Sequence, residues 1–394
     1  MKKLLILTSL YPNPQNPVRG TFVREQVKVL EYEYNVRIIA WEFPVAFSHE
    51  MWRDGDSQVD YYRFPALVNF FPSAIPAFAW WMLPAIKRIY KEWQPDIIHV
   101  HEYTHIPSLF VLKYWLDGLP TPKYLTLHNL KSIPGLMNHA STDFIYRNTL
   151  KRALSGWSHI FCVNRKLMEY IQSFYTQTSF IGNGIRAMDR ISSPSIDKIK
   201  DWLKTDRFHL IAVGNLLPSK GFDLLIEAVA ILEKSGKTCQ LLIVGSGEME
   251  PRLQRLITKS RLNGNVWIHP PLPNEVVRSL YYEFDAYVMP SYSETFGIVY
   301  LEAMYADIPV IGVVEQGIYG LFEESKEALF CLPQDVSDLK DKIMLLYDNP
   351  ALRKSLAKAA KTRLLKEYML PCIVEKITQA YDNNQSINEQ KSRI

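Results

Sequence analysis

Short runs of apolar residues alternate along most of the chain with longer stretches in which apolar positions recur at helical spacing. The apolar runs that we predict as strands cover 4–8, 36–40, 97–101, 124–127 and 160–163 in the first half, and 209–213, 240–244, 266–269, 286–289 and 310–314 in the second. Helices are predicted over 22–33, 150–155, 224–234, 249–260, 274–282 and 298–305. Because parallel strands are buried on both faces, this alternation predicts parallel sheets covered by helices.

The predicted elements divide into two groups near residues 182–206. Gly182-Asn183-Gly184 is a turn signal, and a polar segment at 192–195 precedes the next strand. A chain of 394 residues is also long enough for two domains. We therefore predict Rossmann-like domains over 1–182 and 183–370 with a cleft between them, a C-terminal helix from about 371 that packs back on the first domain, and a frayed polar tail at 382–394.

Composition supports a folded protein, because 47% of the residues are hydrophobic and 22% are charged. The four cysteines lie far apart without a C-x-x-C pair, which argues against a disulfide framework or a zinc site and fits a reducing cytoplasm. The run at 4–7 is too short for a signal peptide and reads as a first strand. Residues 1–182 are net positive, which either indicates an anionic partner or is ordinary scatter.

The segment 68–86 is apolar and contains Trp80, Trp81 and three prolines, and the basic residues Lys87 and Arg88 follow it. The prolines argue against a membrane-spanning helix. Two interpretations remain open: a buried loop and helix of the first domain, or an interfacial segment that places aromatic rings at the depth of lipid headgroups with cations beside them.

The segment from Ser291 to Glu302 carries the strongest chemical signal. Glu294 is predicted in the loop between a strand and a helix, at the carboxyl edge of the sheet. Gly297 and Ile298 open that helix, whose free N–H groups can hold a diphosphate. Glu294 could instead be a carboxylate that stabilises the helix dipole, and Glu302 an exposed helix charge. However, Glu302 lies in an apolar run, so its carboxylate needs a partner, either a ligand hydroxyl or a basic group.

Two glutamates seven residues apart, with Phe-Gly between them, resemble the signature of glycosyltransferase family 4. Four further segments resemble motifs of that family in the same order along the chain: 95–101, 181–185, 213–221 and 243–248. The resemblance implies the GT-B fold, a nucleoside-diphosphate sugar as the donor and retention of the anomeric configuration. It implies no cofactor and no metal, because a lysine and a helix N-terminus can neutralise the departing diphosphate.

The resemblance also implies roles for single residues. Glu294 would contact the transferred sugar, Lys220 would neutralise the diphosphate, and His128 would lie at a strand end near sugar and acceptor. The expected substrate-binding residues are Gly20, Thr21, Gly214, Asn215, Gly245, Leu272, Thr295, Phe296, Gly297, Ile298 and Glu302, of which Glu302 would bind the ribose. The chain departs from the family at Asn215, where an arginine is common. Arg186 and Arg190 are candidates to replace that charge.

Other polar features have a plain structural interpretation beside a functional one. His99 and His101 alternate on one strand and are expected to be core histidines with satisfied hydrogen bonds. The loop 13–21 matches the family's flexible first loop, where Gly20 would let a ligand approach the backbone, or it is a proline-rich surface turn. Asp54-Gly55-Asp56 resembles a metal-binding pair of another glycosyltransferase fold, but it follows no clear strand, and we expect a solvated turn.

The predicted activity is therefore a retaining sugar transfer to a glycan or lipid-linked acceptor, in the synthesis of a cell-surface polysaccharide or glycolipid. We expect a cytoplasmic protein that can associate peripherally with the inner face of an anionic membrane through its first domain, and no nucleic-acid partner. An epimerase of the same fold and a non-catalytic subunit that binds sugar nucleotides remain alternatives. A dinucleotide oxidoreductase is disfavoured, because no G-x-G-x-x-G follows the first strand.

Overall fold

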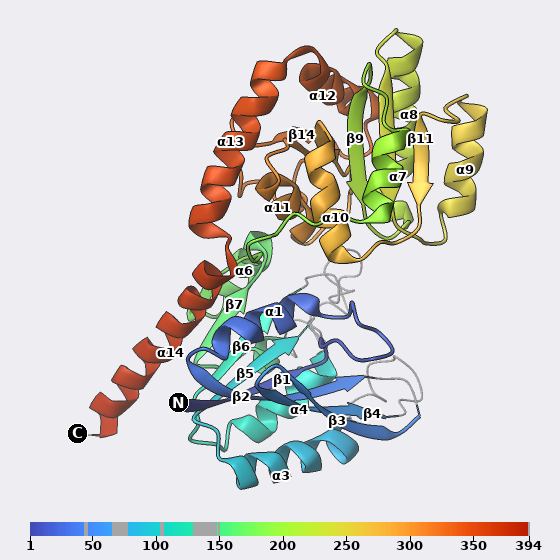
Figure 1. The fold of residues 1–394 in the computed structure, drawn as a ribbon. Coiled ribbons are helices and arrows are strands. Elements are labelled where there is room, and N and C mark those ends of the chain that lie inside the picture. The colour runs from blue at the N-terminus through green and yellow to red at the C-terminus, as the bar shows by residue number, and fades with distance from the viewer. Residues whose placement is uncertain (43–45, 65–77, 103–105, 129–147, 149, 393–394) are drawn as a thin grey trace. The chain divides into compact units, whose positions relative to one another are not determined.

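The computed structural model describes residues 1–42, 46–64, 78–102, 106–128, 148 and 150–392 (Figure 1). The chain forms two compact units. The first comprises Met1–Asn183 together with the C-terminal segment from Leu370, and the second comprises Gly184–Met369. Each unit contains its own sheet, with helices packed against it.

The first unit contains an eight-stranded sheet in the order β3-β4-β2-β1-β5-β6-β7-β8. The strands are β1 (Lys2–Thr8), β2 (Tyr34–Glu42), β3 (Ser48–Asp54), β4 (Ser57–Arg63), β5 (Ile97–Glu102), β6 (Lys123–Leu127), β7 (His159–Cys162) and β8 (Thr178–Phe180). All neighbours pair in parallel except β3 and β4, which form an antiparallel hairpin at the edge. The strand order reverses direction between β1 and β5, which makes this point the topological switch of the sheet.

Helices cover both faces of this sheet. They are α1 (Thr21–Leu30), η1 (Phe78–Met82), α3 (Leu83–Trp93), α4 (Ile106–Leu116), α6 (Arg165–Gln172) and α14 (Leu370–Ser392). Alternate residues of β1 point to opposite faces: Leu4 and Ile6 belong to the cluster that includes α1 and α14, and Leu5 and Leu7 to the cluster that includes α3 and α4. Two-sided burial explains why β1 reads as a continuous apolar run.

The C-terminal helix α14 packs on the sheet of the first unit, against α1. Its Tyr381 is fully buried, and the Tyr381 hydroxyl lies 2.5 Å from Nδ1 of His99 on β5. The polar segment from Asp382, for which we predict fraying, continues this helix as far as Ser392.

The second unit contains a six-stranded parallel sheet in the order β11-β10-β9-β12-β13-β14. The strands are β9 (Phe208–Val213), β10 (Cys239–Val244), β11 (Val266–His269), β12 (Ala286–Val288), β13 (Val310–Val313) and β14 (Leu329–Cys331). Numbered within the unit, this is the doubly wound order 3-2-1-4-5-6, with its switch point between β9 and β12.

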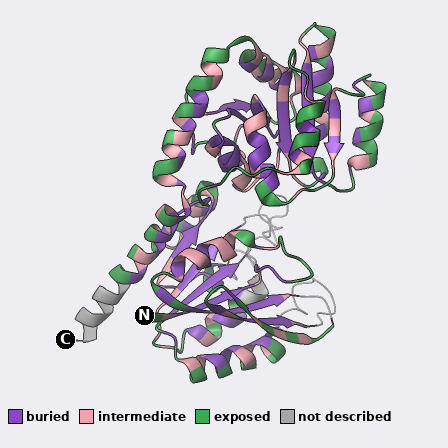
Figure 2. Ribbon diagram, in the orientation of Figure 1, coloured by how far each residue is buried: buried purple, intermediate pink, exposed green. Residues whose placement is uncertain are grey.

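The helices of the second unit are α7 (Pro194–Trp202), η2 (Pro218–Lys220), α8 (Phe222–Lys234), α9 (Glu250–Lys259), α10 (Asn274–Leu280), η3 (Tyr281–Glu283), α11 (Ile298–Tyr305), α12 (Val336–Asp348) and α13 (Pro350–Glu367). The strands are buried, whereas the helices turn exposed residues outward (Figure 2). None of the helices in the described ranges is long and apolar enough to cross a membrane.

Candidate functional site

Two loops meet at the switch point of the second sheet. One follows β9 and ends with η2, which positions Lys220; the other follows β12 and carries Glu294. The Lys220 Nζ lies 2.6 Å from Oε2 of Glu294. Both side chains are largely buried, with 20% and 14% of their surface exposed. Because ligands of doubly wound sheets bind at the carboxyl edge beside the switch point, this ion pair lies where a ligand is expected.

The Glu294 loop is held by hydrogen bonds to its own backbone and to the loop after β13. The Glu294 carboxylate accepts from the Thr295 N–H through Oε1 at 3.1 Å. The Glu294 N–H donates to Oε1 of Gln316 at 3.1 Å, and the Gly317 N–H donates to the Glu294 carbonyl at 3.1 Å. Gly317 has φ +56°, and a Cβ there would lie 3.2 Å from the Glu294 Cγ, so any side chain at this position would strain the backbone and crowd Glu294.

Helix α11 begins directly after this loop, at Gly297. The backbone of Gly297 is left-handed, with φ +77°, and an added Cβ would lie 2.6 Å from the Tyr300 ring. The Tyr300 hydroxyl in turn donates to the Met289 carbonyl at 2.8 Å, which ties the first turn of the helix to the end of β12. The Tyr300 N–H donates to the Gly297 carbonyl at 3.0 Å, which leaves the N–H groups of Ile298 and Val299, for which no hydrogen bond is described, available to an anion. Phe296 is buried, so only its backbone can face a ligand.

Of the two partners that the sequence allows for Glu302, a ligand hydroxyl or a basic group, the structure shows the basic group. Its Oε1 accepts from Nε of Arg278 on α10 at 2.9 Å, and both side chains are nearly buried. Burial raises the pKa of Glu302 above its ordinary value, although the charge of Arg278 acts in the opposite direction. The pair therefore fixes the carboxylate of Glu302, a buried residue of α11, inside the unit.

The predicted phosphate loops approach each other so closely that glycine is required. A Cβ on Gly245, after β10, would lie 2.0 Å from the Gly214 carbonyl oxygen, after β9. Asn215 is exposed beside Gly214, and Leu272 is half-buried in the loop after β11. The structure therefore places Gly214, Asn215, Gly245 and Leu272 in loops at the same carboxyl edge as Lys220.

Neither arginine proposed to replace the missing charge at Asn215 is brought to Lys220 by a described contact. Arg190 forms an ion pair with Glu283 and lies over the Tyr282 ring, 5.2 Å from its centroid. Arg186 is an exposed residue of the segment that precedes α7. Among the described residues, Lys220 is thus the cation that the structure places against Glu294.

In the first unit, three histidines form a buried row at the carboxyl ends of β5 and β6. His99 is hydrogen-bonded to Tyr381 and to Thr126 Oγ1 at 2.7 Å, as expected for a core histidine. His101 lies against His128, with Nδ1 3.2 Å from Nε2 and the rings stacked. His128 also contacts the Phe22 ring of α1, at 4.6 Å between centroids.

Burial keeps these histidines neutral. It holds the pKa of His128 well below its ordinary value, and the neighbouring His101 adds to the effect. Burial also lowers the pKa of His101 to about 3, and that of His99 well below the ordinary value. A neutral His128 can donate or accept one hydrogen bond at each ring nitrogen, but it carries no charge to a ligand.

The first loop has a structural reason for its glycine. Gly20 caps α1 with φ +61°, and an added Cβ would lie 2.4 Å from the carbonyl group of Leu10. Packing of the chain on itself therefore requires this glycine, whether or not a ligand approaches it. Thr21 is exposed at the first position of α1. Arg19 fixes the loop by donating to the Ser9 carbonyl at 3.0 Å and to Glu42 at 2.8 Å.

The Asp54-Gly55-Asp56 segment is a turn with Gly55 and Asp56 exposed, as predicted, but Asp54 is not solvated and the turn directly follows a strand, contrary to our prediction. It connects β3 to β4, and Asp54 is buried. The Asp54 carboxylate accepts from Arg24 at 2.6 and 2.8 Å and from the Tyr11 hydroxyl at 3.0 Å. A pattern of three residues cannot show partners that lie 30 or more positions away. Among the described residues, no cluster of three or more His, Cys, Asp or Glu could hold a metal ion.

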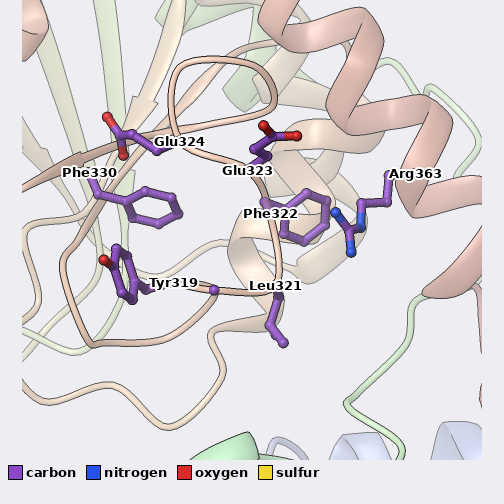
Figure 3. Close-up of a pocket in the computed structure, with 8 residues that line it drawn as sticks. Tyr319, Leu321, Phe322, Glu323, Glu324, Phe330 and Arg363 are labelled. Carbon is purple, nitrogen blue, oxygen red and sulfur yellow. The ribbon is translucent and has the colours of Figure 1, made fainter.

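A pocket of about 390 Å³ in the second unit lies on the loop that continues from Gly317 (Figure 3). The Tyr319 and Phe330 rings meet edge to face on one side, and Arg363 lies over Phe322 on the other. Arg363 is paired with Glu327 at 3.0 Å. None of the residues that line this pocket is among the predicted site residues.

Sequence reasoning missed the residues that position the two glutamates, namely Gln316, Gly317 and Arg278. Gln316-Gly317 follows the strand that we predict at 310–314, so its position at the carboxyl edge of the sheet was a usable signal. The sequence contains no comparable signal for Arg278, because it lies within a predicted helix as many surface arginines do.

Comparisons with known proteins agree along both units. The family described as "Glycosyl transferases group 1" matches residues 195–363, and the one described as "Glycosyltransferase Family 4" matches residues 20–187. An uncharacterized glycosyltransferase of Haemophilus influenzae is 30% identical over 256 residues, which cover 64% of this chain and 70% of that protein. The putative teichuronic acid biosynthesis glycosyltransferase TuaC of Bacillus subtilis is 27% identical over 83% of this chain and 85% of its own.

Other relatives match over shorter regions. The alpha-D-kanosaminyltransferase of Streptomyces kanamyceticus is 30% identical, and the match spans 45% of this chain and only 46% of that protein. Among solved structures, the sucrose-phosphate synthase of Thermosynechococcus elongatus superimposes with a TM-score of 0.77 at 18% identity, over 98% of this chain and 100% of the other. Anabaena HepE in complex with UDP-glucose superimposes with a TM-score of 0.71 at 17% identity, over 97% and 100%. At these identities the likeness shows a shared fold.

Proposed function

Because the chain belongs to the family 4 glycosyltransferases, we propose that it transfers a sugar from a nucleoside-diphosphate sugar to an acceptor, with retention of the anomeric configuration. Its fold is the GT-B fold of that family. The observation that carries the proposal is the Lys220–Glu294 ion pair at the switch point of the second sheet, beside the start of α11. The HepE structures with UDP and UDP-glucose support a nucleotide sugar as the donor.

The proposed chemistry follows from the charges at this point. As the bond between the sugar and the diphosphate breaks, negative charge grows on the diphosphate and positive charge on the sugar. Lys220 and the free N–H groups at the start of α11 would stabilise the diphosphate, and Glu294 would stabilise the sugar. Since a lysine and a helix N-terminus can neutralise the leaving group, we propose that no metal or other cofactor is needed.

The remaining residues are assigned as follows. Glu302, fixed by Arg278, would accept hydrogen bonds from the ribose hydroxyls. The loop residues at the same edge, with Thr295 and the backbone of 296–298, would surround the diphosphate and the sugar. In the first unit, His128 would meet the sugar and acceptor, and Gly20 and Thr21 would line the acceptor side.

We propose an acceptor in cell-surface polysaccharide or glycolipid synthesis, reached from the cytoplasm at the inner face of the membrane. The relationship to TuaC supports an acceptor of this class. Exposed side chains of the first unit support the proposed location at the membrane. Trp80 and Trp81, which belong to η1, are 78% and 45% exposed. Lys87, Arg88 and Lys91 are exposed on α3, which follows η1 directly, so cations lie close along the chain to the exposed indoles.

A thermal-shift screen of nucleoside diphosphates and their sugars tests the proposal. The correct donor should raise the melting temperature through mass action, in the presence of a chelator as well as of Mg²⁺. Incubation of the stabilising sugar nucleotide alone should leave the sugar unchanged apart from slow hydrolysis, whereas an epimerase would convert it. If no nucleoside diphosphate or sugar nucleotide stabilises the protein, the proposed function is wrong.

A further inference from the structure

The Arg278–Glu302 pair of the second unit has more hydrogen-bonding capacity than its own contact uses. Arg278 donates from Nε to Oε1 of Glu302 at 2.9 Å, and no described hydrogen bond uses its Nη1 or Nη2. Both side chains are largely buried, with 12% and 4% of their surface exposed. Polar groups of such side chains are normally hydrogen-bonded, so the Nη groups of Arg278 need acceptors beyond the described contacts.

The pair lies close to the carboxyl edge of the second sheet. Helix α10 begins at Asn274, after the loop that follows β11 and contains Leu272, and α11 begins at Ile298, after the loop that follows β12. Arg278 and Glu302 each lie one helical turn, or about 6 Å, beyond the first residue of their helix. Because ligands of doubly wound sheets bind at this edge, a bound ligand is within reach of the pair.

Asn274 joins the pair from the same face of α10. Residues four apart on a helix lie on one face, so Asn274 and Arg278 both turn towards Glu302. Burial raises the pKa of Glu302, whereas the Arg278 charge and a hydrogen bond from the Asn274 side chain lower it. A carboxylate has about four acceptor positions, and these contacts from α10 leave about two of them for a ligand.

A ribose complements the groups that remain. Its 2′- and 3′-hydroxyls lie on adjacent carbons, and each has one O–H to donate and lone pairs that accept. The remaining positions of Glu302 match the two O–H groups, and the Nη groups of Arg278 match the hydroxyl oxygens. Stability alone is a weak reason for the pair, because the cost of taking two charges out of water offsets most of their attraction.

We propose that Arg278 contacts the ribose of the sugar nucleotide directly and makes the site selective for its two hydroxyls. Glu302 accepts from both O–H groups, and Arg278 donates from its Nη groups to one or both hydroxyl oxygens. A nucleotide that lacks either hydroxyl leaves buried polar groups of the pair unsatisfied, so it should bind more weakly. This inference rests on the proposed function, which assigns the ribose to Glu302.

Calorimetric titrations of the full chain test this inference. The probes are UDP, ADP and GDP and, for the base that binds, the 2′-deoxy and 3′-deoxy forms of the same diphosphate. The quantity compared is the ratio of the affinity for the ribonucleotide to that for each deoxy form. We expect the wild type to prefer the ribonucleotide about tenfold or more, the effect of one hydrogen bond to a charged group. Equal affinities for all three forms would overturn the proposal.

The variant Arg278→Lys keeps a cation for Glu302 and removes the planar guanidinium. It should weaken ribonucleotide binding about tenfold and binding of a deoxy form much less, so that the ratio falls for at least one hydroxyl. Arg207→Lys is the matched control, because Arg207 is also half-buried and paired with a glutamate, Glu233, at 2.9 Å, but precedes β9 at the opposite edge of the sheet. An Arg278 that were only a counter-ion would weaken all forms equally, which would overturn the proposal.

The double variant Arg278→Gln with Glu302→Gln removes both charges together, so no unpaired charge stays buried. Its ratios should also fall below those of the wild type. If no ribonucleotide binds the wild type, the proposed function fails and this inference with it. If ribonucleotides bind and both Arg278 variants keep the wild-type ratios, only this inference fails.

Discussion

At the scale of single residues, the largely buried Glu294 and the buried Glu302 have partners of different kinds. Glu294 is paired with Lys220, whose flexible chain can turn from the carboxylate to a diphosphate. Glu302 is paired with Arg278, whose planar guanidinium holds it in one orientation. The first arrangement suits a group whose environment changes during the reaction, and the second suits a fixed contact.

We therefore predict different kinetics for the two Glu→Gln variants. Glu294→Gln should lower kcat, because its charge matters most when positive charge develops on the sugar. Glu302→Gln should mainly raise the KM for the donor, because the ribose does not change during the reaction. Steady-state kinetics with the stabilising sugar nucleotide measure both, and a shared rise in KM with unchanged kcat would contradict the assignment.

Glu302→Gln should also destabilise the second unit, because it leaves the Arg278 charge buried without its counter-ion. We expect a loss of about 1–3 kcal/mol in the free energy of unfolding. The double variant Arg278→Gln with Glu302→Gln should recover part of it, since the two losses come from one interaction. Chemical unfolding of both variants checks this, and strictly additive losses would show that the two side chains do not interact.

The three buried histidines of the first unit predict a fall in stability at acid pH. Their pKa values are lowered in the folded state, so the unfolded chain binds more protons below about pH 6.5. This stability is complete above that pH and is lost as the pH falls towards about 3, the lowered pKa of His101. The slope approaches about 1.4 kcal/mol per pH unit for each histidine.

Urea unfolding at pH 7.5, 6.5 and 5.5 measures this slope. His101→Gln should reduce it by about one histidine, because glutamine does not take up a proton in the unfolded state. The same slope in the variant and the wild type would mean that His101 does not contribute.

At the scale of elements, the start of α11 depends on a left-handed glycine. In Gly297→Ala the new Cβ would lie 2.6 Å from Tyr300, so the first turn must shift and its N–H groups lose their positions. Gly236→Ala is the matched control, because Gly236 also has a left-handed φ of +81° but has open space where the Cβ would lie. Both should pay about 1 kcal/mol of backbone strain, and only Gly297→Ala should also lose nucleotide affinity.

Melting temperature and nucleotide affinity of the two glycine variants, measured together, check this prediction. Unchanged affinity in a folded Gly297→Ala protein would exclude the α11 N-terminus from the ligand site.

The sequence predicts most inner strands of both sheets and the edge strand β11, but it misses the edge strands β3, β8 and β14 and the inner strand β4. Strands such as β1 are buried on both faces and read as apolar runs. By contrast, β3 is an edge strand with alternating exposed residues, and β8 and β14 have three residues each, too few for a periodic signal. Strand β3, which carries Trp52 and ends at Asp54, was missed for this reason.

The sequence predicts which residues form the site in the second unit, but it does not predict the contacts between them. Glu294 and Lys220 were visible because each follows a predicted strand. Their ion pair depends on β9 and β12 being neighbours, which the strand order decides and periodicity does not. The same holds for Gln316, which reaches the Glu294 N–H from the loop after a third strand.

At the scale of the whole molecule, the first unit carries exposed aromatic side chains near η1 and exposed cations on α3. Phe47 and Trp81 lie with their ring centroids 5.0 Å apart, and Trp80 is more exposed than either. Residues 68–77 of the apolar segment lie outside the described residues. An anionic bilayer would cover such indoles and pair the cations of α3.

We predict that the protein sediments with vesicles that contain anionic phospholipid and not with neutral ones. Trp80→Ser with Trp81→Ser should reduce the bound fraction severalfold, and Lys87→Gln with Arg88→Gln should remove its salt dependence. Exposed Tyr32 of the same unit offers a control, Tyr32→Ser. No sedimentation of the wild type with either vesicle would show that these side chains have another role.

The central claim is that the carboxyl edge of the second sheet binds the diphosphate of a sugar nucleotide through Lys220. Its most direct test is a calorimetric titration with the nucleoside diphosphate that stabilises the wild type, using Lys220→Ala and, as a control, Lys259→Ala, which removes an exposed lysine of α9. The account predicts that Lys220→Ala weakens binding about ten- to a hundredfold and that the control does not. Wild-type affinity in a folded Lys220→Ala protein would contradict it.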